Sequence, residues 1–226
     1  MKISYYGHSC FSAWVGDRRI LFDPFVTGNP LASGVDVDAI EADLICVSHG
    51  HADHIADCVR IANRTGAKVV TNWEIAQWLQ SKGVADTHGM NIGGEWDFGF
   101  ASLKAVSAIH SSSLPDGSYG GNPMGFTVKT PEKSFYYSGD TALTMDMQLV
   151  PTFVKPDFLL LPIGDNFTMG CEDAARAAHL IACRTVVGLH YGTFPPISID
   201  LEAAARHFER NGLDLLLPAI GATIDI

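Results

Sequence analysis

The positions of histidine and aspartate constrain the fold of this chain most strongly, because five short apolar segments each lead into one of them. The residues that follow these segments are His8, His49, His110, Asp140 and His190. Apolar segments of this length are typical of β-strands. In a sheet that is flanked by helices, binding sites form in the crevice beyond the carboxyl ends of the strands. The pattern therefore predicts that these five side chains share one rim of the fold.

The densest group of such residues is the stretch SHGHADHIAD at Ser48–Asp57, which holds three of the nine histidines. His49 and His51 are two residues apart, so in an extended segment both side chains point to the same side. Asp53 and His54 follow in the first turn of a predicted helix. A turn from strand into helix can thus direct the first two histidines at one point and Asp53 and His54 at another close by.

These residue types are ligands of zinc and similar cations, which take histidine nitrogen and aspartate oxygen at about 2.0–2.2 Å. Two histidines from one short segment also lower the entropic cost of assembling a site. The alternative is that Asp53 is a helix N-cap and that the histidines are solvated loop residues. The HxHxDH pattern is much more specific than a lone HxH pair, and it favours the metal site.

Composition limits the class of protein. The chain has 226 residues, of which 47% are hydrophobic, and no linker interrupts it, which predicts a single domain over residues 1–226. No apolar run approaches the roughly 18–20 residues that a membrane helix needs. The first residues lack the apolar region of a secretory signal. We therefore expect a cytoplasmic protein without a membrane partner, whose five scattered cysteines are reduced thiols.

The charge of the chain bears on its partners. The formal net charge is −10 at pH 7, and the densest basic stretch is the pair Arg18–Arg19. A protein that binds nucleic acid carries a basic patch or stripe. The charge therefore predicts a small-molecule substrate and no nucleic-acid partner. It does not exclude an anionic substrate, because metal ions supply local positive charge.

The order of the predicted elements indicates the fold class. Hairpin strands open each half of the chain and are followed by alternating strands and helices. Helices are predicted at Asp53–Thr65, Trp73–Lys82, Leu143–Phe153, Cys171–Ala182 and Leu201–Arg210. This order is typical of two sheets packed face to face with helices outside each, so we expect an α/β (α+β) fold with four αββα layers. The loop Asp23–Ile40 fits a lid or a subunit contact equally well, and the sequence leaves homo-oligomerisation open.

Several residues near the strand ends are weaker candidates for the site. Asp23 either hydrogen-bonds a ligand histidine or only starts a turn before Pro24. His8 has two interpretations. It is either a functional residue of the rim, which hydrogen-bonds a metal ligand, binds substrate or transfers a proton, or it is a structural histidine. The candidates for substrate binding are loop residues, some of which could instead cap a helix: Ser111, Asp165, Asn166, Thr168 and Thr193.

The motif HGHADH at His49–His54, followed by single His110, Asp140 and His190, resembles the five-motif pattern of the metallo-β-lactamase superfamily over nearly the whole chain. Further stretches are similar to a narrower group, the uncharacterised UPF0173 metal-dependent hydrolases. They are GHSCF (Gly7–Phe11), LFDPFVTGNP (Leu21–Pro30), MNIGG (Met90–Gly94), and GDNFTMG (Gly164–Gly170) with HYGTFP (His190–Pro195). That group is in turn similar to the ascorbate-6-phosphate lactonases.

The resemblance implies the metallo-β-lactamase fold and two adjacent divalent cations. Zinc is the expected metal, and manganese, nickel and iron are the alternatives. In the family pattern one set of residues holds the first cation, a second set holds the other, and Asp140 bridges the two. The first set is His49, His51 and His110, and the second is Asp53, His54 and His190. Asp53, Asp140 and His8 are the expected catalytic residues.

These ligands imply a hydrolytic reaction. Two cations about 3.5–4 Å apart can share a hydroxide and polarise the bond that it attacks. We therefore expect a binuclear metal-dependent hydrolase that uses a metal-bound hydroxide to cleave an ester-like bond of a small molecule, such as a lactone, ester, amide or phosphoester. The alternatives are a phosphodiesterase or nuclease of the same fold, an iron-dependent redox enzyme, and a non-catalytic metal-binding module.

Overall fold

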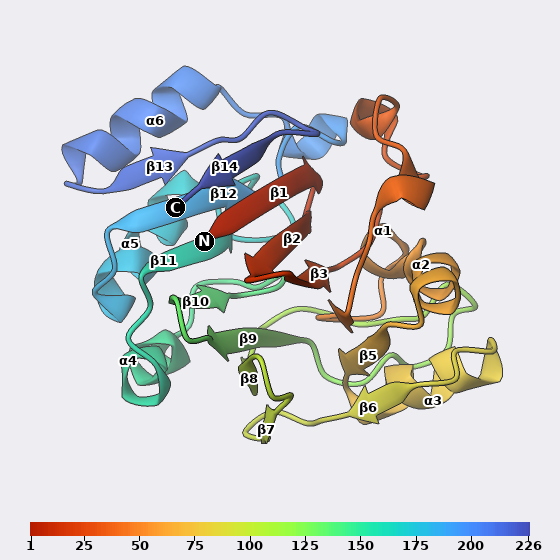
Figure 1. The fold of residues 1–226 in the computed structure, drawn as a ribbon. Coiled ribbons are helices and arrows are strands. Elements are labelled where there is room, and N and C mark those ends of the chain that lie inside the picture. Colours follow the sequence, from red (N-terminus) through yellow and green to blue (C-terminus); the bar gives the residue numbers. More distant parts are fainter.

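The computed structural model describes residues 1–226 and contains two seven-stranded sheets (Figure 1). The first sheet has the strand order β14-β1-β2-β3-β4-β5-β6, and the second has the order β13-β12-β11-β10-β9-β8-β7. The strands of the first sheet are β1 (Lys2–Gly7), β2 (Cys10–Val15), β3 (Arg18–Phe22), β4 (Leu44–Cys46), β5 (Lys68–Thr71), β6 (Thr87–Gly89) and β14 (Thr223–Asp225). Those of the second are β7 (Glu95–Asp97), β8 (Ser102–Ser107), β9 (Met124–Lys129), β10 (Ser134–Tyr137), β11 (Phe158–Pro162), β12 (Thr185–Leu189) and β13 (Asp214–Leu216).

The two sheets share one topology. In the first sheet, strands β14 to β3 pair antiparallel and strands β3 to β6 pair parallel. In the second sheet, strands β7 to β10 pair antiparallel and strands β10 to β13 pair parallel. The parallel half of each sheet is the half that a crossover helix can cover, because parallel strands need long connections. The predicted run from hairpins into alternating strands and helices is thus confirmed.

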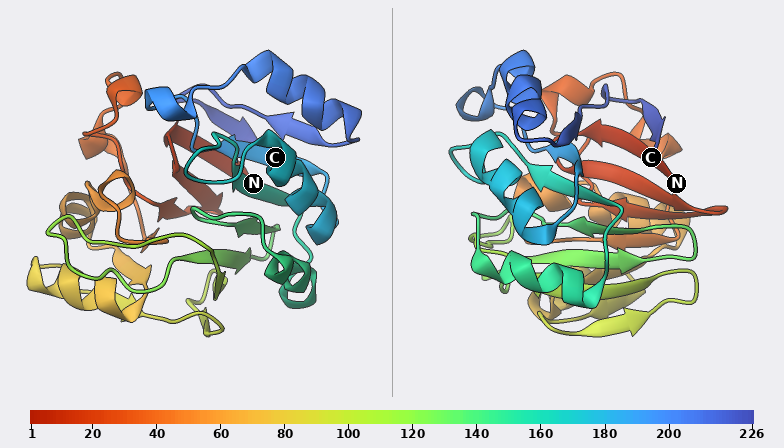
Figure 2. Two further views of the ribbon diagram at one scale, coloured as in Figure 1. Left: turned by 180° about the vertical axis from the view of Figure 1, so that it is seen from behind. Right: turned by 90° about the vertical axis from the view of Figure 1, so that its left-hand side faces the viewer.

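Helices cover the outer face of each sheet, so the predicted four-layer αββα sandwich is confirmed. Figure 1 shows the helices of the two sheets on opposite sides of the molecule, and Figure 2 shows the same layers from behind and from one side. The first sheet carries α1 (Ala52–Ile55), α2 (Cys58–Thr65) and α3 (Trp73–Ser81), and the second carries α4 (Val150–Phe153), α5 (Cys171–Ile181) and α6 (Leu201–Arg210). The 3₁₀ turns are η1 (Pro30–Ala32), η2 (Val37–Ala39), η3 (Met145–Leu149) and η4 (Pro195–Ile197). None of these helices has the length and apolar character needed to cross a bilayer, and all five cysteines are free thiols.

Aromatic side chains fill the space between the two sheets. Phe11 of β2 stacks on Phe22 of β3 with ring centroids 4.6 Å apart, and Phe135 of β10 stacks on Phe158 of β11 at 5.1 Å. Tyr137 of β10 meets the ring of Phe22 edge-on at 5.5 Å, which joins the second sheet to the first. All five rings are fully buried. Full burial of a side chain of this kind contributes about 1.5–3 kcal/mol, so this layer holds the sheets together.

Two helix predictions are wrong in detail. The predicted helix Asp53–Thr65 is divided into α1 and α2, because Asp57 between them bonds to a distant loop. Its carboxylate accepts hydrogen bonds from the backbone nitrogens of Val26 and Thr27 and from the Thr27 hydroxyl. The predicted helix Leu143–Phe153 is the 3₁₀ turn η3 followed by the single turn α4. Pro151 lies in this segment. It has no backbone N–H to donate to the carbonyl oxygen four residues earlier, so a continuous α-helix would lack that hydrogen bond.

Strands β11 and β12 lie close together beyond their carboxyl ends. The backbone nitrogen of Ile163 donates to the carbonyl oxygen of Leu189 at 3.0 Å, and the next residue, Gly164, lies against the backbone of His190. A Cβ atom at Gly164 would lie far inside van der Waals contact with the carbonyl oxygen of His190. Because both groups belong to the backbone, neither can rotate away, and only glycine fits.

We expect the substitution Gly164→Ala to lower the free energy of unfolding by about 3 kcal/mol, the upper end of the usual cost of overpacking. Gly34→Ala is the matched control, because nothing lies within 4 Å of a Cβ atom at Gly34. The control should change stability by no more than about 0.5 kcal/mol. Urea denaturation followed by circular dichroism measures both values, and equal stability of the two variants would contradict the close approach of β11 and β12.

Candidate metal centre

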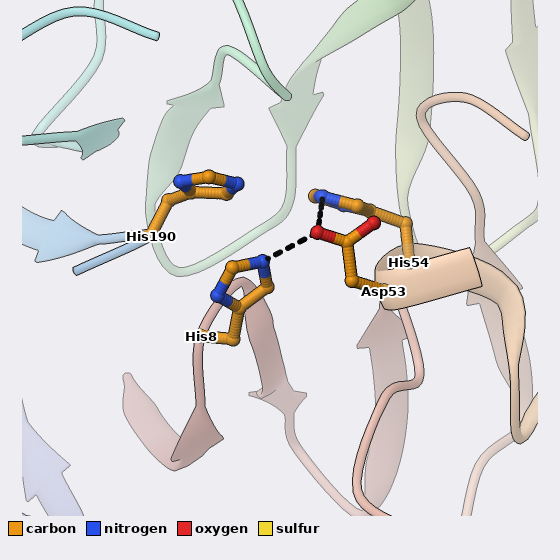
Figure 3. Close-up of side chains that lie close together, drawn as sticks. All are labelled: His8, Asp53, His54 and His190. Atoms are coloured by element: carbon orange, nitrogen blue, oxygen red, sulfur yellow. Dashed lines mark hydrogen bonds and ion pairs between the residues drawn. The ribbon is translucent and has the colours of Figure 1, made fainter. Parts of the chain in front are cut away.

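The strand ends named above meet at one edge of the molecule. β4 leads into His49 and His51, and α1 carries Asp53 and His54. His110, Asp140 and His190 lie in the loops that follow β8, β10 and β12, and His8 follows β1. Figure 3 shows four of these side chains, which point toward one another: Asp53 and His54 from α1, His8 from the turn after β1, and His190 from the end of β12. The rim predicted from the strand-end pattern is therefore present.

Asp140 lies at the middle of the cluster. Its Oδ2 atom is 3.0 Å from Nε2 of His190, 3.3 Å from Nε2 of His54, 3.7 Å from Nε2 of His110 and 4.0 Å from Nε2 of His49. Only 3% of the Asp140 side chain is exposed. One carboxylate oxygen thus lies near the nitrogens of four imidazoles, which is the place that a bridging ligand occupies.

The remaining donors form two groups on either side of this carboxylate. Ligand atoms within 4.8 Å of one another occur in the group His49, His51 and His110. A second such group is Asp53, His54 and His190 together with His8. These two groups coincide with the ligand sets that the family pattern implies, with His8 as an addition to the second. A third group, Asp23, His49 and His54, overlaps both. The structure therefore brings together all seven residues that the sequence singles out as metal ligands.

His8 lies behind Asp53 and is 1% exposed. Its Nε2 is 3.1 Å from Oδ2 of Asp53, and its Nδ1 is 2.9 Å from Oγ1 of Thr193. Burial lowers the pKa of His8 to about 4, so the ring is neutral at pH 7. A carboxylate can only accept, so Nε2 donates to Asp53 and Nδ1 accepts from the hydroxyl of Thr193. This geometry assigns His8 the task of holding Asp53 in place.

Asp23 orients two of the histidines through a buried network. Its Oδ2 accepts hydrogen bonds from His54 Nδ1 at 2.7 Å, from the Ser48 hydroxyl at 2.5 Å and from the Tyr137 hydroxyl at 2.5 Å, while Oδ1 accepts from the Ser48 nitrogen at 2.7 Å. Because the Ser48 hydroxyl donates to Asp23, it accepts from His49 Nδ1, which lies 3.0 Å away. Nδ1 of each imidazole is therefore the nitrogen that donates to the protein, which makes Nε2 of each the nitrogen available to a metal.

The electrostatics of the cluster favour a cation. Burial disfavours a charged imidazole at His54, but the carboxylates of Asp140 and Asp23 outweigh burial and raise the pKa of His54 well above its ordinary value. Burial likewise opposes a charged Asp140, yet the imidazoles of His54 and His190 outweigh it and hold the pKa of Asp140 well below its usual range. The carboxylates thus draw positive charge into a buried site.

The hydrogen-bond pattern also fits a metal ion. Three buried polar atoms of the cluster have no hydrogen-bond partner: His54 Nε2, Asp140 Oδ1 and His190 Nδ1. Buried polar atoms are nearly always paired, so unpaired atoms indicate a further ligand. The donors are imidazole nitrogen and carboxylate oxygen without thiolate, a set that suits zinc, manganese, nickel or iron.

The alternative that the motif is a capped, solvated turn is wrong. The N-cap of α1 is His51, which makes no side-chain cap hydrogen bond, and Asp53 lies inside the first turn. His49 and His54 are completely buried, and His190 is 2% exposed. Buried histidines that face one another are not solvated loop residues.

A cleft of about 410 Å³ opens onto the cluster. Its lining consists of His51, Asp53, His110, Ser111, Asp140, Phe167, His190, Phe194 and Pro196. Ser111 therefore lies where the sequence predicts it, with Oγ 3.3 Å from Nε2 of His51. Asp165, Asn166 and Thr168 do not line the cleft, and Thr193 is buried against His8.

The apolar part of this lining escaped the sequence analysis. Phe167 and Phe194 lie within GDNFTMG and HYGTFP, two stretches quoted for the family resemblance. Both are aromatic, whereas the loop residues predicted from the sequence to bind substrate are polar. An aromatic residue beside predicted ligands in such a stretch is the signal that could have found them.

Comparisons with known proteins show the family to which this chain belongs. The family model described as the β-lactamase superfamily domain matches residues 18–191. A UPF0173 metal-dependent hydrolase of Christiangramia forsetii is 49% identical over 100% of both chains, and one of Flavobacterium johnsoniae is 47% identical over 100% of both. The solved structure of Igni18, a metallo hydrolase from the archaeon Ignicoccus hospitalis, has a TM-score of 0.89 at 34% identity and covers 99% of this chain and 97% of its own. The chain therefore belongs to the β-lactamase superfamily and, within it, to the UPF0173 metal-dependent hydrolases.

Proposed function

We propose that this chain holds two divalent cations and uses them to hydrolyse an ester-like bond of a small molecule, such as a lactone, ester, amide or phosphoester. The observation that carries the proposal is the position of Asp140, whose Oδ2 lies within 4.0 Å of four imidazole nitrogens between two groups of donors. A pair of cations at such a site lowers the pKa of water and polarises the bond that is cleaved.

Each group of donors supports one cation. His49, His51 and His110 form the first group, and Asp53, His54 and His190 form the second. Oδ2 of Asp140 lies 3.7 Å from Nε2 of His110 in the first group and 3.0 Å from Nε2 of His190 in the second. The hydrogen bonds of Asp23 and Ser48 to Nδ1 of His54 and His49 make Nε2 of each the nitrogen available to a metal. These side chains are aligned before any ligand arrives, so binding costs little reorganisation.

The residues on the cleft wall act on the substrate. Asp53 is held at Oδ2 by His8, and 29% of its side chain is exposed, so it is the carboxylate placed to accept a proton from the attacking water. Ser111, at the mouth of the cleft beside His51, is placed to hydrogen-bond an oxygen of the substrate. A nuclease is not favoured, since no lysine or arginine lines this cleft to neutralise a phosphate backbone.

The double substitution His49→Ala with Asp140→Ala tests the proposal. We expect the wild type to hold two metal ions per chain and to hydrolyse members of a panel of lactones, esters and phosphodiesters, and the variant to lose at least one ion and about 10³-fold or more in kcat/KM. Elemental analysis and the panel give both values. His179→Ala is the control, because His179 is exposed on α5.

Three results would contradict the proposal in different ways. Unchanged metal content in the double variant would show that His49 and Asp140 are not metal ligands. Full metal content in a wild type that hydrolyses nothing would favour a binding module. Iron with a visible absorption band that changes on exposure to oxygen would favour a redox enzyme.

A second prediction concerns Asp23. We expect Asp23→Asn to weaken metal binding by about 10–100-fold, because the amide nitrogen that replaces one carboxylate oxygen cannot accept the hydrogen bonds by which Asp23 orients His54 and Ser48. Competition with a chromophoric chelator measures the affinity. Asp57→Asn is the matched control, since Asp57 is also buried and hydrogen-bonded but touches no histidine. The control should lose stability and keep its metal affinity; equal affinities in the two variants would overturn the role of Asp23.

A further inference from the structure

We propose that the part of the substrate that does not react is an uncharged aromatic or branched apolar group, which packs against Phe167 and Phe194. This inference rests on the proposed hydrolytic function and names the chemical class of the substrate. It depends on the charge, the shape and the rigidity of the cleft beside the metal centre.

The charge of the cleft excludes an anionic group away from the reacting bond. The only charged side chains in its lining are Asp53 and Asp140, and none is a lysine or arginine. Some basic residues elsewhere form surface ion pairs, as Arg18 does with Asp43 at 2.7 Å and Arg64 does with Glu41 at 2.9 Å. A carboxylate or phosphate remote from the metal ions would leave water without gaining a partner, which is costly.

One part of the cleft wall is apolar. Phe167, Phe194 and Pro196 form it. Phe167 is 54% exposed, although an aromatic ring of its size gains by burial. Phe194 is half-buried and is supported from behind, with its ring centroid 5.6 Å from that of His8 and 6.5 Å from that of Phe25. Exposed rings beside a reactive centre are typical of a surface that a ligand covers.

The loop that carries Phe167 is rigid. Asp165 and Asn166, which precede it, both have left-handed backbone conformations, with φ of 63° and 58°. The backbone nitrogen of Asp165 donates to the carbonyl oxygen of Met169 at 3.1 Å. The backbone nitrogen of Met169 in turn donates to the carbonyl oxygen of Thr141 at 3.0 Å. Non-glycine residues persist in such conformations only where the surroundings hold them. The backbone that carries Phe167 is therefore held in place before a ligand binds, which limits the entropy lost on binding.

The role of this loop explains why Asp165, Asn166 and Thr168 stay off the cleft. The Asp165 carboxylate accepts from the backbone nitrogen of Asn166 at 2.7 Å, and the Thr168 hydroxyl donates to the carbonyl oxygen of Met169 at 3.4 Å. Their polar atoms stabilise the turn, and the turn places Phe167 in the lining of the cleft.

Binding of three hydroxamates to the metal-loaded protein tests the inference without turnover. The probes are acetohydroxamate, phenylacetohydroxamate and the latter with a carboxylate on the para position of its ring. We expect the phenyl probe to bind about tenfold or more tightly than the acetyl probe, and the added carboxylate to remove this gain. Isothermal titration calorimetry measures the three affinities.

Variants of Phe167 test whether the preference for the phenyl probe comes from the apolar part of the cleft wall. Phe167→Ala should reduce the advantage of the phenyl probe to about threefold or less while leaving the affinity for acetohydroxamate unchanged, which shows that the metal centre is intact. Phe167→Leu should keep part of the advantage. Phe153→Ala is the matched control, since Phe153 is 43% exposed and lies outside the cleft, and it should keep the full advantage.

The inference is overturned if the carboxylated probe binds as tightly as the phenyl probe, if Phe167→Ala and Phe153→Ala behave alike, or if none of the probes binds. Its failure is distinct from failure of the proposed function. A protein that prefers the phenyl probe but hydrolyses nothing on the panel loses the hydrolase proposal alone. A protein that hydrolyses the panel but shows no such preference loses this inference alone.

Discussion

The rest of the structure depends on the hydrogen bonds that the buried carboxylate of Asp23 accepts. Asp23 follows β3, and it accepts hydrogen bonds from Ser48 after β4, from His54 on α1 and from Tyr137 on β10 of the other sheet. Burial, and then the charge of Asp23, raise the pKa of the Tyr137 phenol, so Tyr137 stays protonated and donates. A buried charge without partners costs several kcal/mol. The donors that prevent this cost at Asp23 come from both sheets, so the packing of the sheets and the orientation of His54 depend on the same hydrogen bonds.

The same network explains why the site lies where it does. β3 and β4 are parallel neighbours in the first sheet, and β10 to β12 are parallel in the second. Their carboxyl ends face one edge, where Asp23, His49, Asp140 and His190 are gathered. His8, Asp23 and His190 all have positive φ, with values of 56°, 41° and 53°. Such conformations are costly for residues other than glycine and cluster at functional sites.

The sequence was sufficient for the layers and for the cluster of seven candidate ligands. Strand-end histidines and aspartates are visible in one dimension, because an apolar run and the polar residue after it are neighbours in the chain. The division of the helix at Asp57 was not predictable, since it depends on hydrogen bonds to Val26 and Thr27, about thirty residues away. The place of Phe167 in the cleft depends on two left-handed residues before it, which no periodicity reveals. His8 could be selected as a rim residue, but its contacts with Asp53 and Thr193 come only from the folded chain.

The central claim is that side chains from separate strand ends hold two cations on either side of Asp140. X-ray diffraction from crystals of the metal-loaded protein, collected at the absorption edge of the bound metal, tests it most directly. We predict two anomalous peaks about 3.5–4 Å apart, one among His49, His51 and His110 and the other among Asp53, His54 and His190. A single peak elsewhere in the molecule, or no anomalous density between these side chains, would contradict the claim.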